Sequence, residues 1–211
     1  MSPKPRSRTK TPSPRRETDV RPETALPDPS AEISHLHIYL TGYRGSGKSS
    51  VGKMLAKKLR RVCIDLDDEV ERLAGRTIHE VFARDGEAAF RDLEENALRE
   101  ASRRPPAVIS LGGGAVLRTD NRDIIRKTGI CVWLQVDAAT VLQRLNRDSG
   151  TPDRRPALTT LSPRQEIETL LEKREPIYRE VADHQVDTIG RGVRAITTRV
   201  LRALGLLDQP P

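Results

Sequence analysis

A glycine-rich stretch near the start of the chain has the spacing of a phosphate-binding loop. Residues 42–49, GYRGSGKS, match the pattern G-x-x-x-x-G-K-[ST] between an apolar run and a stretch with helical periodicity. Glycines let successive backbone N–H groups turn inward around phosphate oxygens, and the start of a helix adds partial positive charge. Lys48 is expected to reach the β- and γ-phosphates, and Ser49 to ligate Mg²⁺ directly. The pattern predicts a nucleoside triphosphate site formed by Gly45, Ser46, Gly47, Lys48, Ser49 and Ser50.

A pair of acidic residues closes the next apolar run, VCIDLD at 62–67. Asp65 and Asp67 are two residues apart, and positions i and i+2 of a strand point to the same face. If the strand extends this far, one carboxylate can support Mg²⁺ through water while the other accepts a hydrogen bond from an attacking hydroxyl. The alternative is the solvated start of a helix, because acidic residues also favour helix initiation.

Two further features are open to more than one interpretation. In EAAFRDLEE (87–95), Phe90 and Leu93 are expected to face inward, and Arg91 with Glu94 forms an i, i+3 pair that is ordinarily a surface ion pair. Three consecutive glycines, 112–114, follow the apolar run AVISL and lose much conformational freedom on folding. Such a run suits a place where a ligand packs directly on the backbone, although a plain loop is the alternative.

The elements that must position these residues alternate between strand-like and helix-like segments. Strands are predicted at 37–42, 62–67, 107–114 and 130–136, with a short last strand in HQVDT. Helices are predicted at 48–59, from a Thr77–Glu80 capping box through Phe82, and at 86–102, 137–147, 163–182 and 193–207. Pro163 suits a first helical turn, whereas Pro176 predicts a kink or break. Alternating strands and helices predict an α/β fold with a parallel sheet covered on both faces and a ligand site at the carboxyl ends of the strands.

The first 33 residues differ in composition from the rest of the chain. They are rich in Pro, Ser, Thr and charge with almost no apolar periodicity, which predicts a disordered arm. The segment lacks the apolar centre of a secretory signal. Its many Arg and Ser residues fit an organellar transit peptide, but its five acidic residues argue against one: Glu17, Asp19, Glu23, Asp28 and Glu32. Residues 208–211 are expected to be a tail.

The charge and cysteine content narrow the function classes. The net charge is +7 and the isoelectric point is about 9.8, but 30 acidic residues are interleaved with the basic ones and no basic stripe with stacking aromatics occurs. This pattern favours an enzyme of polyanionic ligands over a nucleic-acid-binding protein. Cys63 and Cys131 lie in apolar runs without metal-ligand spacing, as expected of buried thiols in a reducing compartment. No apolar stretch approaches the roughly 20 residues needed to span a bilayer, so we expect a protein that does not bind membranes. We also expect it to be a cytoplasmic monomer.

In their order and spacing, the motifs together resemble the shikimate kinase family. The segments that carry the resemblance are GYRGSGKSS, DLDDEVERLAGRTIHEVFARDGEAAFRDLEE, SLGGGAV, DRRPAL and KREPIYREVAD, and it spans residues 36–206. The resemblance implies a three-layer P-loop kinase fold related to the nucleoside monophosphate kinases, with a five-stranded parallel sheet in the order 2-3-1-4-5. It also implies a single kinase domain at 34–207, with a substrate-binding helical segment at about 66–98 and a lid at about 148–160.

The family resemblance assigns expected roles to residues that match its motifs. Asp67 would bind the shikimate hydroxyls and assist deprotonation, and Asp65 would belong to the magnesium shell through water. The carboxylate of shikimate would be held by Arg91 and Arg174, with the backbone at Gly113 touching its ring. On the ATP side the expected residues are Arg155 in the lid, Arg191 near adenine and Arg144 stacking near the base.

The activity implied is ATP-dependent phosphorylation of the shikimate 3-hydroxyl, giving 3-phosphoshikimate and ADP in aromatic amino acid biosynthesis, with Mg²⁺ as cofactor. One rival is a related kinase acting on gluconate or a nucleoside monophosphate. A second is a nucleotide-binding regulatory or nucleic-acid-binding protein without catalysis, in which the basic arm is the functional part.

Overall fold

Within the described residues, five parallel strands form one sheet in the order β2-β3-β1-β4-β5, as the family resemblance implied. The structure is a computed structural model and describes residues 33–147 and 162–207. The strands are β1 (His37–Thr41), β2 (Cys63–Asp65), β3 (Val108–Ser110), β4 (Gly129–Gln135) and β5 (His184–Asp187). In the central strand, Ile38 pairs with Val108 on one side and with Ile130 on the other. The sheet therefore has β1, and the loop that follows it, at its centre.

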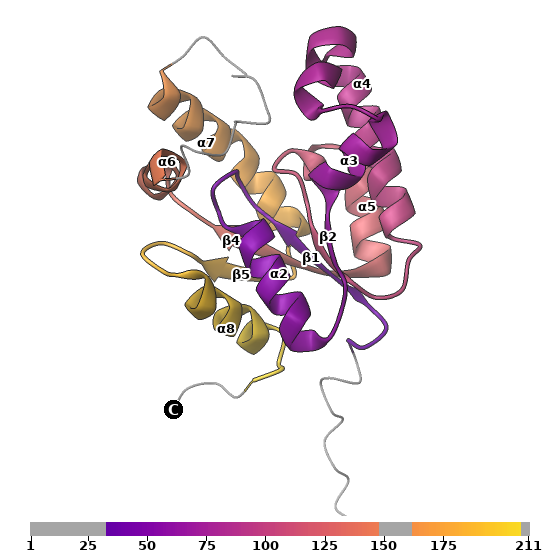
Figure 1. The fold of residues 1–211 in the computed structure, drawn as a ribbon. Coiled ribbons are helices and arrows are strands. Elements are labelled where there is room, and N and C mark those ends of the chain that lie inside the picture. The colour runs from indigo at the N-terminus through magenta and orange to yellow at the C-terminus, as the bar shows by residue number, and fades with distance from the viewer. Residues whose placement is uncertain (1–32, 148–161, 208–211) are drawn as a thin grey trace, which may run out of the picture.

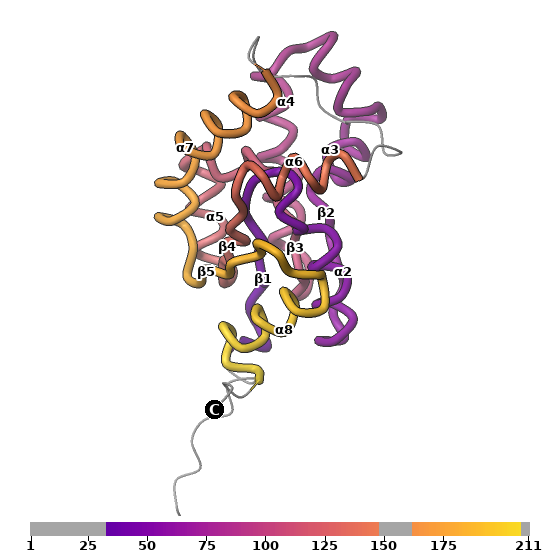
Figure 2. Tube along the Cα trace, turned by 90° about the vertical axis from the view of Figure 1, so that its left-hand side faces the viewer, coloured from indigo at the N-terminus to yellow at the C-terminus, as the bar shows by residue number. Residues whose placement is uncertain are grey.

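Alternating side chains along β1 divide the core into two layers. Ile38 and Leu40 pack with residues of α2 (Lys48–Leu59) and α8 (Val193–Ala203). Tyr39 points to the opposite face, into a larger cluster built with α3 (Leu66–Ala74), α4 (Ile78–Ala101), α5 (Thr119–Thr128) and α7 (Pro163–Val181). Figure 2 shows α5 and α7 on one side of the strands and α2 on the other. Burial of apolar surface on both faces holds this three-layer arrangement together.

The helices that were predicted lie close to their observed positions. The Thr77–Glu80 capping box forms at the start of α4, and this helix bends at Gly86, which has φ 79°, so the two predicted helices are joined at a kink. Helix α6 (Ala138–Arg147) follows β4. The short 3₁₀ helix η1 (Ala115–Leu117) and α5 occupy a stretch for which no element was predicted. In Figure 1, α3 and α4 lie on the right of the sheet's upper end, and α6 and α7 lie on its left.

The predicted extent of the second strand was wrong, and one of two outcomes predicted for Pro176 does not occur. The second strand ends at Asp65 rather than at residue 67, because the Asp65 carboxylate accepts the Asp67 N–H at 3.1 Å and caps α3. Asp65 and Asp67 are thus a helix cap and a first-turn residue, not two positions on one face of a strand. Of the kink or break predicted at Pro176, the break does not occur, because α7 continues to Val181. Packing of the helix's buried residues, among them Arg174 and Tyr178, outweighs the loss of one backbone hydrogen bond.

The chain enters the described structure at Ile33, which is buried. Arg61 donates from Nη2 to the Ile33 carbonyl at 2.7 Å and from Nη1 to the Leu36 carbonyl at 2.8 Å, which fastens the chain to the end of α2. The predicted arm, apart from Ile33, and the predicted tail lie outside the described residues. Within the described ranges, no helix has the length and apolar character required to cross a membrane.

His37 at the start of β1 makes stability depend on pH. Its Nδ1 accepts the Ala107 N–H at 3.2 Å, and its Nε2 lies 3.2 Å from the Ser102 carbonyl. Burial lowers the pKa of His37 below its ordinary value of 6.5, and the Arg61 cation lowers that pKa further, against the opposing bond to Ser102. The unfolded chain therefore takes up this proton first as pH falls, so the free energy of unfolding should be largest above pH 6.5 and decrease below it.

We expect His37→Asn, whose side-chain carbonyl can replace the Nδ1 acceptor, to unfold with a smaller difference in free energy between pH 7.5 and pH 5.5 than the parent chain. Urea unfolding at the two pH values measures this. His79→Asn is the matched control, because His79 is exposed. An identical pH dependence for the parent chain and His37→Asn would contradict the assignment.

Candidate active site

The phosphate-binding loop, residues 42–49, connects β1 to α2 at the centre of the sheet. Gly42 has φ 138°, and a Cβ atom there would lie 2.6 Å from the Leu134 carbonyl oxygen of β4. Gly47, directly before α2, has φ 98°. Side chains are disfavoured in both conformations, so the glycines of the motif are required by the turn itself. The loop presents the amino end of α2, where negative charge is stabilised.

The side chains of the loop hold it in shape. Lys48 donates from Nζ to the carbonyl oxygens of Gly42 at 2.8 Å and Tyr43 at 2.9 Å. The Ser46 side chain is buried, and its Oγ has no hydrogen-bond partner among the described residues. Ser49 and Ser50 are exposed at the start of α2. The Lys48 ammonium group and the serine hydroxyls of this loop are hydrogen-bond donors of the kind that suit phosphate oxygens.

Arg144 of α6 joins this loop to the segment that follows β5. Its Nη1 donates to the Gly45 carbonyl at 2.8 Å, and its Nη2 donates to the Thr188 carbonyl at 2.7 Å. Arg191, expected near adenine, lies in the same segment, where its guanidinium lies 3.3 Å from Asp187 Oδ2. The structure thus brings Arg144 and Arg191 to one side of the phosphate loop. Stacking of Arg144 on a base stays a prediction.

The acidic pair lies next to the motif serine. Ser49 Oγ donates to Asp65 Oδ2 at 2.6 Å, and Asp67 follows in the first turn of α3. Burial raises the pKa of Asp65, the Ser49 hydrogen bond opposes that rise, and the neighbouring carboxylates of Asp67 and Asp68 add to it. One hydroxyl and one carboxylate, both oxygen donors, form a set that a hard cation such as Mg²⁺ prefers.

Both arginines expected to bind a carboxylate reach the triple-glycine loop. The guanidinium of Arg91 lies against Gly114 so closely that a Cβ atom there would be 2.6 Å from Nη1. Arg174 of α7 donates from Nη1 to the Gly113 carbonyl at 3.3 Å, and Tyr178 one turn later donates its hydroxyl to the same oxygen at 2.5 Å. Helices α4 and α7, far apart in the chain, therefore place two cations at consecutive glycines.

The Arg91–Glu94 pair, interpreted from its spacing as a surface ion pair, is buried. Arg91 Nη1 lies 2.6 Å from Glu94 Oε2, and the two side chains are only 10% and 1% exposed. The exposed Glu87, one turn earlier, lies 3.0 Å from Nη2. The spacing of two residues along a helix shows that they can pair, but it does not show which face of the helix is buried. Here the face of α4 that carries Arg91 and Glu94 is buried.

Sequence reasoning gave no site role to Glu94 or Tyr178. Glu94 had a detectable signal, since it shares the stripe of α4 that buries Phe90, Ala97, Leu98 and Ala101, and a carboxylate within an apolar stripe needs a cationic partner. No signal in the sequence pointed to Tyr178, because its role depends on the position of Gly113, which is 65 residues away in the chain.

The glycine loop packs directly on the phosphate loop. A Cβ atom at Gly113 would lie 3.4 Å from the Gly42 carbonyl oxygen and 3.5 Å from the Arg44 nitrogen. Asp65 pairs in register with Ser110 of β3, shortly before the glycines, so the acidic pair lies at the same edge of the sheet. The phosphate loop, acidic pair and two arginines thus form one site at the carboxyl ends of β1, β2 and β3. Arg155 and the expected lid at 148–160 lie outside the described residues.

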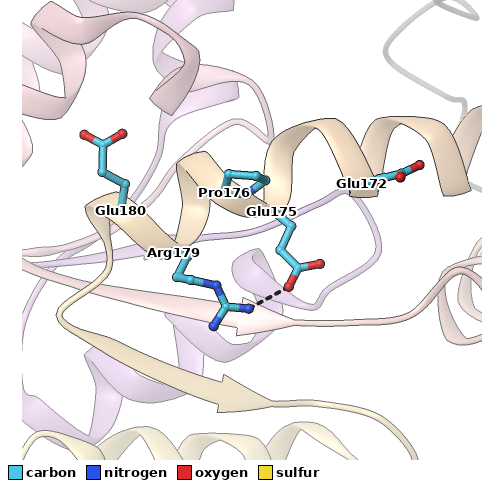
Figure 3. Close-up of a pocket in the computed structure, with 5 residues that line it drawn as sticks. All are labelled: Glu172, Glu175, Pro176, Arg179 and Glu180. Atoms are coloured by element: carbon cyan, nitrogen blue, oxygen red, sulfur yellow. Dashed lines mark hydrogen bonds and ion pairs between the residues drawn. The ribbon is translucent and has the colours of Figure 1, made fainter.

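A hollow of about 460 Å³ lies elsewhere, along the outer face of α7 (Figure 3). Its lining residues are all exposed, and Arg179 forms a 2.7 Å ion pair with Glu175 across it. The other lining residues are Glu172, Pro176 and Glu180. A wide hollow on one helix, with three carboxylates and no glycine backbone, lacks the features of a phosphate site, so we assign it no role in catalysis.

Comparison with known proteins agrees with this geometry. The shikimate kinase family model matches residues 44–205. A shikimate kinase of Rhodopirellula baltica is 49% identical over 172 residues, which cover 82% of this chain and 92% of that protein. The solved structure of a shikimate kinase from Acinetobacter baumannii in complex with shikimate has a TM-score of 0.75 and 36% identity, and the match covers 83% of this chain and 96% of that one.

A gluconokinase structure from Sinorhizobium meliloti has a TM-score of 0.56 at 21% identity, over 82% of this chain and 93% of that one, and shares the fold alone. The matching family model covers the phosphate loop from Arg44 onward, both helices that supply the arginines, and the glycine loop between them. The chain therefore belongs to the shikimate kinase family.

Proposed function

We propose that the chain transfers the γ-phosphoryl group of ATP to the 3-hydroxyl of shikimate, producing 3-phosphoshikimate and ADP. The observation that carries this proposal is the convergence of Arg91 and Arg174 at Gly113 and Gly114, beside the phosphate loop. Guanidinium groups bind a planar carboxylate with fixed orientation. A site with two arginines beside a phosphate loop suits an alcohol that carries a carboxylate.

In the proposed reaction, Lys48 and the backbone N–H groups of residues 45–49 bind the phosphates of ATP. Arg91 and Arg174 hold the shikimate carboxylate while the ring lies on the Gly113 backbone. Asp67 accepts the proton of the 3-hydroxyl, whose oxygen attacks the γ-phosphorus as the bond to the ADP oxygen breaks. The side chains thus supply position and charge, which are the main requirements of phosphoryl transfer.

The oxygen donors at Ser49 and Asp65 fit a magnesium ion, which Ser49 would hold directly and Asp65 through water. When bound, Mg²⁺ supplies neutralisation of the phosphate charge. In this assignment Asp65 keeps its hydrogen bond to the Asp67 N–H, and so fixes the start of α3, which carries the proposed base.

The remaining assignments complete the proposal. Arg155 closes on the phosphates from a lid at about 148–160 and excludes water from the transferred group. Arg191 contacts the adenine side of ATP, next to Arg144, which positions the loop. Residues 34–207 act as one monomeric kinase domain in the cytoplasm, in the pathway to aromatic amino acids, and residues 1–33 are not required for the chemistry.

The expected result of a substrate comparison is release of ADP with shikimate and little release with gluconate or CMP. Gluconate carries a carboxylate and is the substrate class of a protein with the same fold, so it is the sharpest competitor. Coupled assays with each compound at equal concentration, with and without Mg²⁺, measure the difference. Turnover of gluconate or CMP in the absence of turnover with shikimate would contradict the proposal.

A further inference from the structure

An ion pair links the first turn of α7 to the phosphate loop. Glu166 Oε1 lies 3.6 Å from Arg44 Nη2, and the Glu166 side chain is only 4% exposed. Arg44 occupies one of the variable positions of the loop motif, so the motif itself does not require it. Beside the pair, Tyr43, Val141 and Ile167 form a small buried cluster that joins the loop to α6 and α7. A carboxylate buried in such a place affects its neighbours far more than one in water.

Two guanidinium groups, those of Arg44 and Arg174, lie against the aromatic ring of Tyr43. The central carbon of Arg44 lies 6.0 Å, and that of Arg174 5.8 Å, from the centroid of the Tyr43 ring. Tyr43 is buried, which raises the pKa of its hydroxyl, while both guanidinium groups act to lower that pKa. Cations gathered around one buried ring repel each other, and negative charge nearby weakens this repulsion. Glu166 supplies that charge on the Arg44 side.

We propose that Glu166 is a positioning residue for recognition of the acidic substrate. By holding Arg44 in its position against the Tyr43 ring, it keeps this cation from displacing Arg174, whose guanidinium stays at the Gly113 carbonyl. This inference rests on the proposed function, in which Arg174 binds the shikimate carboxylate. It adds a role for three residues that were not among those expected to bind substrate, namely Tyr43, Arg44 and Glu166.

The effect should fall on shikimate and not on ATP. The phosphate loop is held by bonds that do not involve Glu166: Lys48 to the Gly42 and Tyr43 carbonyls, and Arg144 to the Gly45 carbonyl. Arg174, by contrast, is held at the glycine loop by one bond of 3.3 Å and by its contact with the Tyr43 ring. A displaced cation near Tyr43 therefore changes the orientation of Arg174 before it changes the backbone of the loop.

The test is steady-state kinetics of the full chain with both substrates varied. We expect Glu166→Gln to raise the KM for shikimate about fivefold to tenfold, as loss of one buried charge interaction implies, while kcat and the KM for ATP change less than about twofold. Adding Arg44→Gln removes the cation that Glu166 pairs with, so the double variant should return the KM for shikimate to within about twofold of the parent value. Glu166→Asp keeps the charge on a shorter side chain and should give an intermediate KM.

Glu168→Gln is the matched control, because Glu168 pairs with Arg164 on the exposed face of the same helix turn. A Glu166→Gln variant that raises both KM values equally, or that only lowers the melting temperature, overturns the inference. A double variant no better than the single one also overturns it. If the parent chain releases no ADP with shikimate, the proposed function fails and this inference fails with it. If the parent chain is active and the Glu166 variants have the same KM for shikimate, only this inference is refuted.

Discussion

Asp67→Asn is expected to lower kcat for shikimate phosphorylation by about a hundredfold to ten-thousandfold, the range that removal of a general base produces. Asparagine keeps the size of the side chain, and its amide oxygen can still accept a hydrogen bond from the substrate hydroxyl, but the amide cannot take up the hydroxyl proton. The start of α3 should be preserved, because the cap is the Asp65 carboxylate and the bond at Asp67 comes from the backbone N–H. ATP binding, measured by calorimetry with a non-hydrolysable analogue, should stay close to that of the parent chain.

Asp68→Asn is the control for this variant. Asp68 lies in the same first turn of α3 and is exposed, so the substitution removes the same charge one residue away. Its effect on kcat should be less than about threefold, as expected of a surface charge. Near-normal turnover in Asp67→Asn would remove this residue from the proposed mechanism. Equal decreases of kcat in both variants would show that Asp67 contributes only negative charge to the site and not a specific base.

Glu94→Ala should be among the most destabilising single changes in the domain. The substitution leaves the Arg91 guanidinium buried without its 2.6 Å partner, and breaking a buried pair in this way costs about 3–5 kcal/mol of unfolding free energy. The same change frees Arg91 to move away from Gly114, so the KM for shikimate should rise in whatever fraction stays folded. Urea unfolding and kinetics at low temperature measure the two effects.

Glu87→Gln provides a matched comparison on the same guanidinium. Glu87 binds Arg91 at 3.0 Å, but its side chain is 58% exposed, so solvent can replace it. Its removal should cost at most about 1 kcal/mol. Comparable losses for Glu87→Gln and Glu94→Ala would show that burial of the second carboxylate has no special effect, contrary to this prediction.

Much of the fold could be predicted from the sequence, because it depends on the conformational preferences of neighbouring residues. The glycine pattern at 42–49 requires backbone conformations that only glycine adopts easily, so the turn could be identified without any tertiary contact. Helix α2 begins at Lys48 and ends at Leu59, as its apolar periodicity predicted. The order of the strands came with the family resemblance and is confirmed. Where a short polar helix carried a weak pattern, as in α5, no element was predicted.

The errors share one cause. Whether the chain after Asp65 continues as a strand or turns into a helix depends on a side-chain cap, and both outcomes suit the residues of VCIDLD. Whether Pro176 ends α7 depends on how much the helix buries on either side of it. Whether Arg91 and Glu94 are exposed depends on what covers α4. Each outcome is decided by side-chain contacts of the folded chain that the local residue pattern does not specify.

The sequence by itself determined the triphosphate loop, the α/β class and the types of residue that could bind an alcohol carrying a carboxylate. These features depend on neighbours in the chain. Only the tertiary structure decided that Arg91 and Arg174 meet at adjacent glycines, that Glu94 is buried, and that Glu166 reaches Arg44. Those contacts join residues up to 122 positions apart, and the distance between such residues is set by the parallel sheet, which brings the carboxyl ends of separate strands to one edge.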